Sequence, residues 1–311
     1  MNTVSDAPPR LPVARRGDYA QSRLVLGTAQ LGMAYGVANR AGRPADDVAA
    51  RLLATAADLG VTHLDTARAY GDSEDRIGDL ATDLPLRVVT KVAPQGPDAT
   101  PASVRASVTR SLAALRRPGP HTLLLHRAAD AAVGWPTLHE YAATGAADRI
   151  GVSVQSPDEL RSVLTLPGLG YVQLPCNALD RRWLAPDLAA LLAGRPELVV
   201  TVRSVYLQGL LTAGRAVTWP HVTDAHRDTI VDSLDRVAAA LGRADRADLC
   251  VAYVLSLPWV TSIVVGAETE AQLRRNAALA ARRPLTPAEG AVVRAALPDI
   301  PAPLLDPAQW P

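Results

Sequence analysis

The stretch Leu64-Asp65-Thr66-Ala67-Arg68-Ala69-Tyr70-Gly71 places a carboxylate and a phenol five positions apart. An apolar run from Val61 leads into it, so Asp65 stands where a strand is expected to end and a loop to begin. Two later apolar runs also end on an ionisable residue, Lys91 in one and His126 in the other. The ends of parallel barrel strands bring their side chains together around one pocket. These runs therefore predict a barrel whose strand ends carry the chemistry.

The rest of the chain supports this architecture, because short apolar runs alternate with longer amphipathic ones. The apolar runs are hydrophobic almost throughout, which is typical of parallel strands buried on both faces. Eight strands are predicted, at residues 24–27, 61–65, 86–91, 122–126, 150–154, 171–174, 198–203 and 261–265. Eight strands separated by helices predict an α/β fold, the (β/α)8 TIM barrel.

The predicted helices begin with recognisable cap residues. An N-cap residue followed by a first-turn proline, a capping box, or both together open helices at Thr100, Ser156, Thr269 and Thr286. Two helix candidates, at 223–241 and 244–256, follow the seventh strand, where a minimal barrel needs only one. We therefore expect extra helices after strand seven and near the C-terminus.

Composition narrows the class of protein. A chain of 311 residues, 48% of them hydrophobic, can bury a large core, and barrels of this length form one domain. We expect a flexible tail over residues 1–18 and a single barrel domain over 19–311. The 32 basic and 31 acidic residues give a charge of +1 without a basic block, so no nucleic-acid partner is expected.

Cysteine usage and hydropathy point to a compartment. Cys176 and Cys250 lie far apart in sequence, so neither a disulfide framework nor a metal site is expected, and a reducing cytoplasm fits. No apolar stretch approaches the roughly 20 residues of a membrane span. The sequence thus predicts a cytoplasmic protein that does not enter the membrane.

Asp65, Tyr70, Lys91 and His126, taken in this order, resemble the catalytic tetrad of the aldo-keto reductases. The resemblance implies reduction of a small-molecule carbonyl by a nicotinamide cofactor, with Tyr70 as general acid and His126 orienting the substrate. Hydride transfer leaves negative charge on the carbonyl oxygen, so a proton donor must lie within reach of it. By resemblance, Lys91 lowers the pKa of Tyr70 and Asp65 anchors Lys91; a neighbouring ammonium favours a phenolate.

The resemblance extends to cofactor-binding residues. Ser153 and Gln173 stand where the family binds the nicotinamide carboxamide. Many members carry an Asn directly after that Ser, and Val154 takes its place here. Arg203 takes the place of a Tyr that usually stacks on the nicotinamide, and a planar guanidinium can also stack. Contact of Arg203 with a phosphate or an acidic substrate is the alternative. Further predicted cofactor contacts are Gly27, Thr28, Ser204, Leu207, Gly209, Gly266, Glu268, Gln272 and Asn276.

The residues after the last strand bear on the choice of cofactor. The turn at Gly266 leads into a helix, and a helix N-terminus suits a phosphate. Many NADPH-using relatives place Lys and Arg where this chain has Gly266 and Gln272. Glu268 could instead accept from a ribose hydroxyl, while Arg274 and Arg275 could compensate. The resemblance implies NADP(H), and NAD(H) or dual use stays open.

Substrate contacts are predicted at Tyr35, Arg127 and Trp183, and an aldehyde, a ketone or a sugar carbonyl would fit. Three alternatives remain at this point. The first is an NAD-dependent sugar or alcohol dehydrogenase that works in the oxidising direction. The second is a nicotinamide-binding regulatory subunit with little turnover. The third is an isomerase or aldolase that forms a Schiff base at Lys91.

Overall fold

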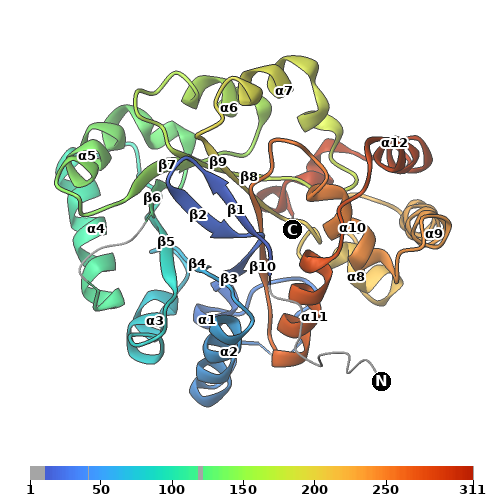
Figure 1. Ribbon diagram of the computed structural model, residues 1–311, viewed down its shortest axis with the longest axis horizontal. Helices are drawn as coiled ribbons and strands as arrows, with labels where there is room; N and C mark the ends of the chain where they lie inside the picture. The colour runs from blue at the N-terminus through green and yellow to red at the C-terminus, as the bar shows by residue number, and fades with distance from the viewer. Residues whose placement is uncertain (1–10, 41, 118–121, 311) are drawn as a thin grey trace, which may run out of the picture.

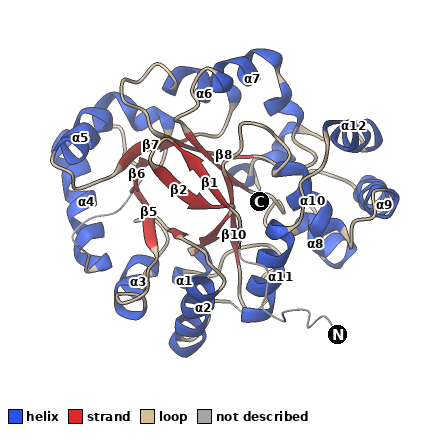
Figure 2. Ribbon diagram, in the orientation of Figure 1, coloured by secondary structure: helices blue, strands red, loops and turns tan. Residues whose placement is uncertain are grey.

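The computed structural model of the protein describes residues 11–40, 42–117 and 122–310. Eight parallel strands close into a barrel with helices around it (Figures 1 and 2). In order around the barrel they are β3 (Leu24–Gly27), β4 (His63–Asp65), β5 (Arg87–Val92), β6 (Thr122–Leu125), β7 (Arg149–Ser153), β8 (Tyr171–Pro175), β9 (Val199–Arg203) and β10 (Ser262–Gly266), and β10 pairs with β3. The predicted (β/α)8 barrel is confirmed.

Helices on the outside of the barrel follow the strands in turn. Their bounds are α1 (Ala29–Gly32), α2 (Asp46–Asp58), α3 (Ser73–Leu80), α4 (Pro101–Leu115), α5 (Ala131–Ala143), α6 (Pro157–Val163), α7 (Pro186–Ala193), α8 (Leu210–Ala213), α9 (Asp224–Ala240), α10 (Arg246–Val254), α11 (Glu270–Ala281) and α12 (Pro287–Ala296). The helices α9 and α10 between β9 and β10, and α12 after α11, confirm the expected additions to a minimal barrel.

Capping explains where several of these helices begin. Thr100, Thr269 and Thr286 each form both hydrogen bonds of a capping box. At Ser156 only half of the expected box is present, because the carboxylate of Glu159 accepts from the Gln155 backbone N–H instead. Local sequence therefore fixes these helix starts within a residue or two.

A short antiparallel hairpin precedes the barrel and lies over its centre in Figure 1. It consists of β1 (Val13–Arg16) and β2 (Tyr19–Ser22). The prediction of a flexible tail to residue 18 is wrong for β1; residues 1–10 lie outside the described residues. The four residues of β1 form too short and mixed a run to stand out in the sequence, and their strand is seen in the pairing with the buried strand β2.

The hairpin covers the N-terminal end of the barrel. The hydroxyl groups of Tyr19 and Thr122 lie 2.8 Å apart, and the Gln21 amide donates to the Tyr171 hydroxyl at 3.1 Å. Thr122 and Tyr171 are the first residues of β6 and β8. The functional groups predicted at the strand ends therefore face the opposite, C-terminal mouth.

A small apolar cluster and a polar layer lie inside the barrel. Tyr19, Val89, Leu124, Tyr171 and Val199 form a small buried cluster near the hairpin. Successive side chains of a strand alternate between its faces, so residues two positions further along point inward again. That spacing puts Lys91 above Val89, His126 above Leu124 and Gln173 above Tyr171. An apolar floor thus supports a polar layer at the mouth.

Within the described residues, no helix is both long enough and apolar enough to cross a membrane.

Candidate active site

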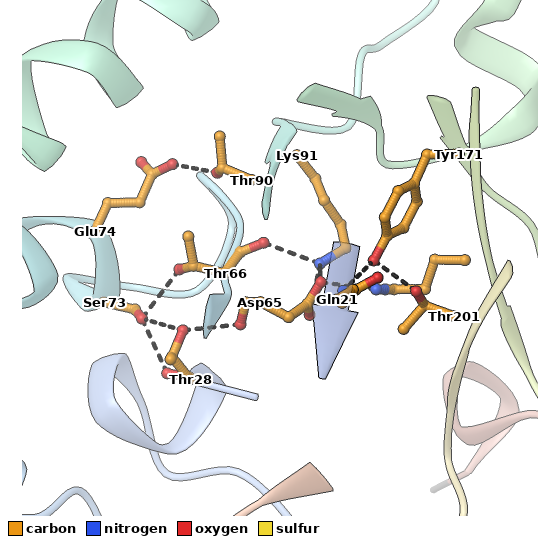
Figure 3. A network of polar contacts seen from close by, with 11 residues as sticks. Gln21, Thr28, Asp65, Thr66, Ser73, Glu74, Thr90, Lys91, Tyr171 and Thr201 are labelled. Atoms are coloured by element: carbon orange, nitrogen blue, oxygen red, sulfur yellow. Dashed lines mark hydrogen bonds and ion pairs between the residues drawn. The ribbon is translucent and has the colours of Figure 1, made fainter. Parts of the chain in front are cut away.

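The centre of the polar layer is an ion pair between Lys91 and Asp65 (Figure 3). The ammonium donates to both carboxylate oxygens and to the Thr66 carbonyl oxygen, each at 2.9 Å. Only 1% of the Lys91 side chain is exposed. Burial alone would lower the pKa of Lys91, but the negative charge of Asp65 and the hydrogen bonds to its carboxylate outweigh burial and raise this pKa. Lys91 is therefore charged at neutral pH.

Lys91 also stands out in the composition of the chain. Among the 32 basic residues of the chain, it is the only lysine. A lysine ammonium is a compact point charge, whereas a guanidinium is a broad planar fork. In a chain that otherwise uses arginine throughout, the lone lysine marks the place where a compact charge is needed.

Tyr70 and His126 complete the predicted set. The Lys91 ammonium lies 5.1 Å from the centre of the Tyr70 ring. The rings of Tyr70 and His126 meet edge to face, with centroids 5.8 Å apart. The structure thus brings together all four predicted residues, from β4, the loop after it, β5 and the end of β6.

His126 is uncharged in this environment. Burial, followed by the positive charges of Lys91, Arg203 and Arg127, lowers the pKa of His126 to about 3. Its Nδ1 is buried and has no hydrogen-bond partner among the described residues. A neutral imidazole can donate one hydrogen bond to a carbonyl oxygen without adding a charge to the site.

The first turn of α3 fastens the loop that carries Tyr70. The Ser73 hydroxyl lies 2.9 Å from both the carbonyl and the hydroxyl oxygen of Thr28, and it accepts from the Thr66 hydroxyl at 3.1 Å. Ser73 therefore ties the ends of β3 and β4 together (Figure 3).

Glu74, the next residue, makes a second tie that the sequence-based analysis missed. Its side chain is 1% exposed and accepts from the Thr90 hydroxyl at 2.5 Å and from the Arg68 guanidinium at 2.9 Å. Thr90 precedes Lys91 on β5, and the Arg68 backbone N–H donates to the Lys91 carbonyl oxygen at 3.1 Å. Glu74 thus fixes the loop between Asp65 and Tyr70 against the strand of Lys91.

Close backbone contact also holds this loop. A Cβ atom on Gly32 would lie 1.9 Å from the Tyr70 carbonyl oxygen, and one on Gly71 would lie 2.2 Å from the Gly32 carbonyl oxygen. No side chain fits between the two segments, so the glycines let α1 approach the Tyr70 loop.

Beside these residues lies a cavity of about 500 Å³. Its walls include Asp65 and Tyr70, together with nine predicted cofactor contacts, namely Gly27, Thr28, Arg203, Ser204, Gly209, Gly266, Glu268, Gln272 and Asn276. Leu207 is fully buried and does not line it. The lining reaches from Asp65 and Tyr70 to the start of α11, and it does not include Lys91 or His126.

The loop after β9 has an unusual backbone. Ser204, Leu207 and Gln208 have φ angles of 63°, 49° and 51°, in the left-handed region that side chains disfavour. Such residues cost on the order of 1–3 kcal/mol each and cluster at binding sites. A Cβ atom on Gly209 would lie 2.6 Å from the Ala38 side chain, so this loop contacts the loop after α1 across the cavity.

Ser153 and Gln173 are Cα partners in the β7–β8 pairing, and both are buried and do not line the cavity. The Gln173 amide nitrogen donates to Asp65 at 2.7 Å, while its amide oxygen is buried without a partner among the described residues. A buried acceptor without a donor is costly. An N–H group of a carboxamide is one donor that would satisfy this oxygen.

At the far end of the cavity, predicted contacts also serve the fold. The Gln272 amide oxygen accepts from the backbone N–H groups of Glu268 and Thr269. The Asn276 amide oxygen accepts from the Tyr206 hydroxyl at 2.9 Å.

The arginines near this end have carboxylate partners. Arg275 is paired with Asp245, and Arg274 lies 4.0 Å from Glu270. Arg246 lies 3.1 Å from Asp235. Asp245, Arg246 and Arg275 line the cavity; Arg275 was considered as a compensating charge, whereas Asp245 and Arg246 were not predicted. They come from the segment around the start of α10 and from α11, so only the folded chain shows that they meet.

The three predicted substrate contacts differ in position. Tyr35 lines the cavity and is 37% exposed. Arg127 is exposed directly after His126. Trp183 is only 2% exposed and donates its indole N–H to Asp180 at 3.0 Å, outside the cavity lining. Trp183 is therefore a core residue, which speaks against its predicted substrate contact.

Comparison with known proteins agrees with this geometry. The family model described as the aldo/keto reductase family matches residues 23–297. The chain belongs to the aldo/keto reductase family. A search of curated proteins finds no match.

Solved structures of aldo-keto reductases share the fold. A Pseudomonas aeruginosa protein assigned to these enzymes is 25% identical, with a TM-score of 0.67 over 90% of this chain and 98% of its own. AKR11C1 from Bacillus halodurans, in its holo form, is 19% identical, with a TM-score of 0.77 over 94% and 97%. The glycerol dehydrogenase AKR11B4 from Gluconobacter oxydans is 22% identical, with a TM-score of 0.72 over 93% and 94%.

The two cysteines of this aldo/keto reductase lie outside the cavity lining. Cys176 and Cys250 are buried and free, and burial raises the pKa of the Cys250 thiol to about 12. Among the described residues, no group of three or more His, Cys, Asp or Glu could hold a metal ion.

Replacing Glu74 by Gln should loosen the Tyr70 loop, because the Arg68 guanidinium loses its buried anion. We expect Glu74→Gln to lower the free energy of unfolding by about 1–3 kcal/mol and to reduce kcat. Asp75→Asn is the matched control, because Asp75 is half exposed and 3.8 Å from Arg68; it should cost less than about 0.5 kcal/mol. Urea unfolding checks both values, and equal losses would contradict the role of Glu74.

The imidazole of His126 should stay neutral between pH 8 and pH 5, because its pKa is lowered from 6.5 to about 3. Below about pH 6.5 the unfolded chain takes up a proton that the folded imidazole does not, so stability falls as the pH drops. NMR titration of the histidines checks this, with His126→Gln identifying the resonance. A midpoint above pH 5 for that resonance would contradict the expectation.

Proposed function

We propose that the protein reduces the carbonyl group of an aldehyde, a ketone or a sugar to an alcohol, with hydride from NAD(P)H and with Tyr70 as general acid. One observation carries the proposal. A buried ammonium, held 2.9 Å from both oxygens of Asp65, lies 5.1 Å from the Tyr70 ring, and His126 flanks the same ring.

The chemistry assigns a role to each side chain. The nicotinamide, when bound, supplies the hydride to the carbonyl carbon. Tyr70 donates its phenolic proton to the carbonyl oxygen as negative charge grows there. The Lys91 ammonium stabilises the resulting phenolate, and Asp65 keeps that ammonium in place. Neutral His126 donates a hydrogen bond to the same oxygen and so orients the substrate.

The cofactor would lie along the cavity. Ser153 and the unpaired oxygen of Gln173 would bind the carboxamide, and Arg203 would contact the nicotinamide ring. The loop of Ser204 and Gly209 would bind the phosphates, and the start of α11 would bind the adenosine. The resemblance implies NADP(H). Because the arginines at the adenosine end already have carboxylate partners, we propose that NAD(H) is used as well.

Three other functions are weaker. All four residues that resemble the tetrad lie together, which argues against a regulatory subunit with little turnover. All three donors of Lys91 are engaged and its pKa is raised, so it is a poor Schiff-base nucleophile for an isomerase or aldolase. Alcohol or sugar oxidation with NAD(H) would use the same residues in reverse, and Glu268 at the adenosine end favours it as second candidate.

Two free, buried cysteines support a cytoplasmic location.

Removing the phenolic hydroxyl of Tyr70 should stop the reaction without preventing cofactor binding. We expect Tyr70→Phe to lower kcat by about 100-fold or more, while the Kd of NADPH and NADH changes little. Steady-state turnover across a carbonyl panel and cofactor fluorescence titration measure the two effects. Tyr141→Phe, on the outer helix α5, is the control. Retention of most activity in Tyr70→Phe would show that another group is the acid.

Exchanging the charge of Glu268 should change cofactor choice, because a carboxylate repels the 2′-phosphate of NADP(H) and a lysine attracts it. We expect Glu268→Lys to raise the preference for NADPH over NADH by about tenfold or more. Asp83→Lys, an equal charge change on the exposed N-terminal side of the barrel, is the control. An unchanged ratio of kcat/KM values in Glu268→Lys would exclude Glu268 as the discriminator.

A further inference from the structure

The two ends of the cavity differ in how their cations are balanced. At the adenosine end, Arg275 is paired with Asp245, and Arg246 lies 3.1 Å from Asp235. At the tetrad end, the charge of Lys91 is balanced by Asp65, and His126 is neutral. The tetrad end also carries a guanidinium that has no carboxylate partner among the described residues.

That guanidinium belongs to Arg203, at the end of β9. It is half-buried and lines the cavity together with Asp65 and Tyr70. Its side-chain contact within the described residues is a hydrogen bond to the Val154 carbonyl oxygen at 3.3 Å. A carbonyl offers a dipole and no full charge, so the positive charge of Arg203 is not neutralised. Exposed Arg127, which also has no carboxylate partner among the described residues, adds to it from the rim.

The inference rests on the proposed function, which fixes where the nicotinamide must lie. Hydride passes from the nicotinamide to a carbon whose oxygen takes the proton of Tyr70. The ring must therefore lie next to Tyr70, at the end of the cavity that Arg203 lines. Arg203 would thus face a ring whose charge changes in the reaction, since oxidised nicotinamide is a cation and reduced nicotinamide is neutral.

We propose that Arg203 makes this site bind the reduced cofactor more tightly than the oxidised cofactor, by placing an unpaired positive charge beside the nicotinamide ring. Like charges a few ångströms apart at the edge of a protein repel strongly enough to change a binding constant by tenfold or more. The bound equilibrium is thereby shifted toward reduced cofactor, which favours oxidation of an alcohol within the complex.

The test compares the Kd of NADPH with that of NADP⁺, and the Kd of NADH with that of NAD⁺, by fluorescence and calorimetric titration without substrate. The two members of each pair share their phosphates and adenosine, so the ratio of their Kd values isolates the charge of the ring. We expect the full-length protein to bind each reduced form at least about tenfold more tightly, which corresponds to about 1.4 kcal/mol.

Three variants separate charge from packing. Arg203→Met should reduce the ratio about tenfold, chiefly by tightening the oxidised form. Arg203→Lys, which keeps the charge, should keep most of the ratio. Arg110→Met, an exposed arginine on α4, is the control and should leave the ratio unchanged.

The outcomes are distinct. A ratio that is close to one in the unaltered protein, or that survives in Arg203→Met, would overturn the inference while leaving the proposed function intact. An equal loss of affinity for both redox forms in Arg203→Met would also overturn it, because Arg203 would then serve the phosphates. Binding of neither redox form by the unaltered protein would overturn the proposed function itself.

Discussion

The ion pair between Lys91 and Asp65 is the interaction on which the arrangement of the site depends. Taking an ammonium out of water costs several kcal/mol, and a carboxylate at hydrogen-bond distance must offset that cost. The two residues meet because β4 and β5 are neighbours in the barrel. The loop after β4 then folds back so that its carbonyl at Thr66 uses the third ammonium proton. Ser73 and Glu74 hold that loop in place. The strand order, the loop and helix α3 therefore together provide the partners that stabilise the buried Lys91 ammonium.

Much of this was predictable from the sequence for a simple physical reason. Strands buried on both faces are apolar throughout, so the eight barrel strands stand out along the chain. The last residues of these strands lie at the C-terminal end of the barrel. For this reason Asp65, Lys91 and His126 could be assigned to one site from the sequence alone. Helix starts such as Thr269 depend on contacts within four residues, so they too can be predicted from the local sequence.

Features that depend on contacts distant in sequence could not be predicted. The strand β1 forms only because β2 lies beside it over the barrel floor. Glu74 resembles an ordinary acidic residue of a first helical turn until Arg68 and Thr90 are seen to converge on it. Trp183 gave no sign of being a core residue with Asp180 as partner. The pairing of Arg275 with Asp245 is likewise visible only in three dimensions.

The lone lysine has a practical consequence. Because every other basic side chain is an arginine, the protein carries no ε-amino group apart from the one enclosed at the barrel mouth. Acylating dyes, aldehyde fixatives and amine-directed cross-linkers will find no lysine on its surface. Enzymes that attach acetyl or ubiquitin groups to lysine will find none there either. Attachment to a support or a label must therefore go through the chain terminus, a carboxylate or an introduced thiol.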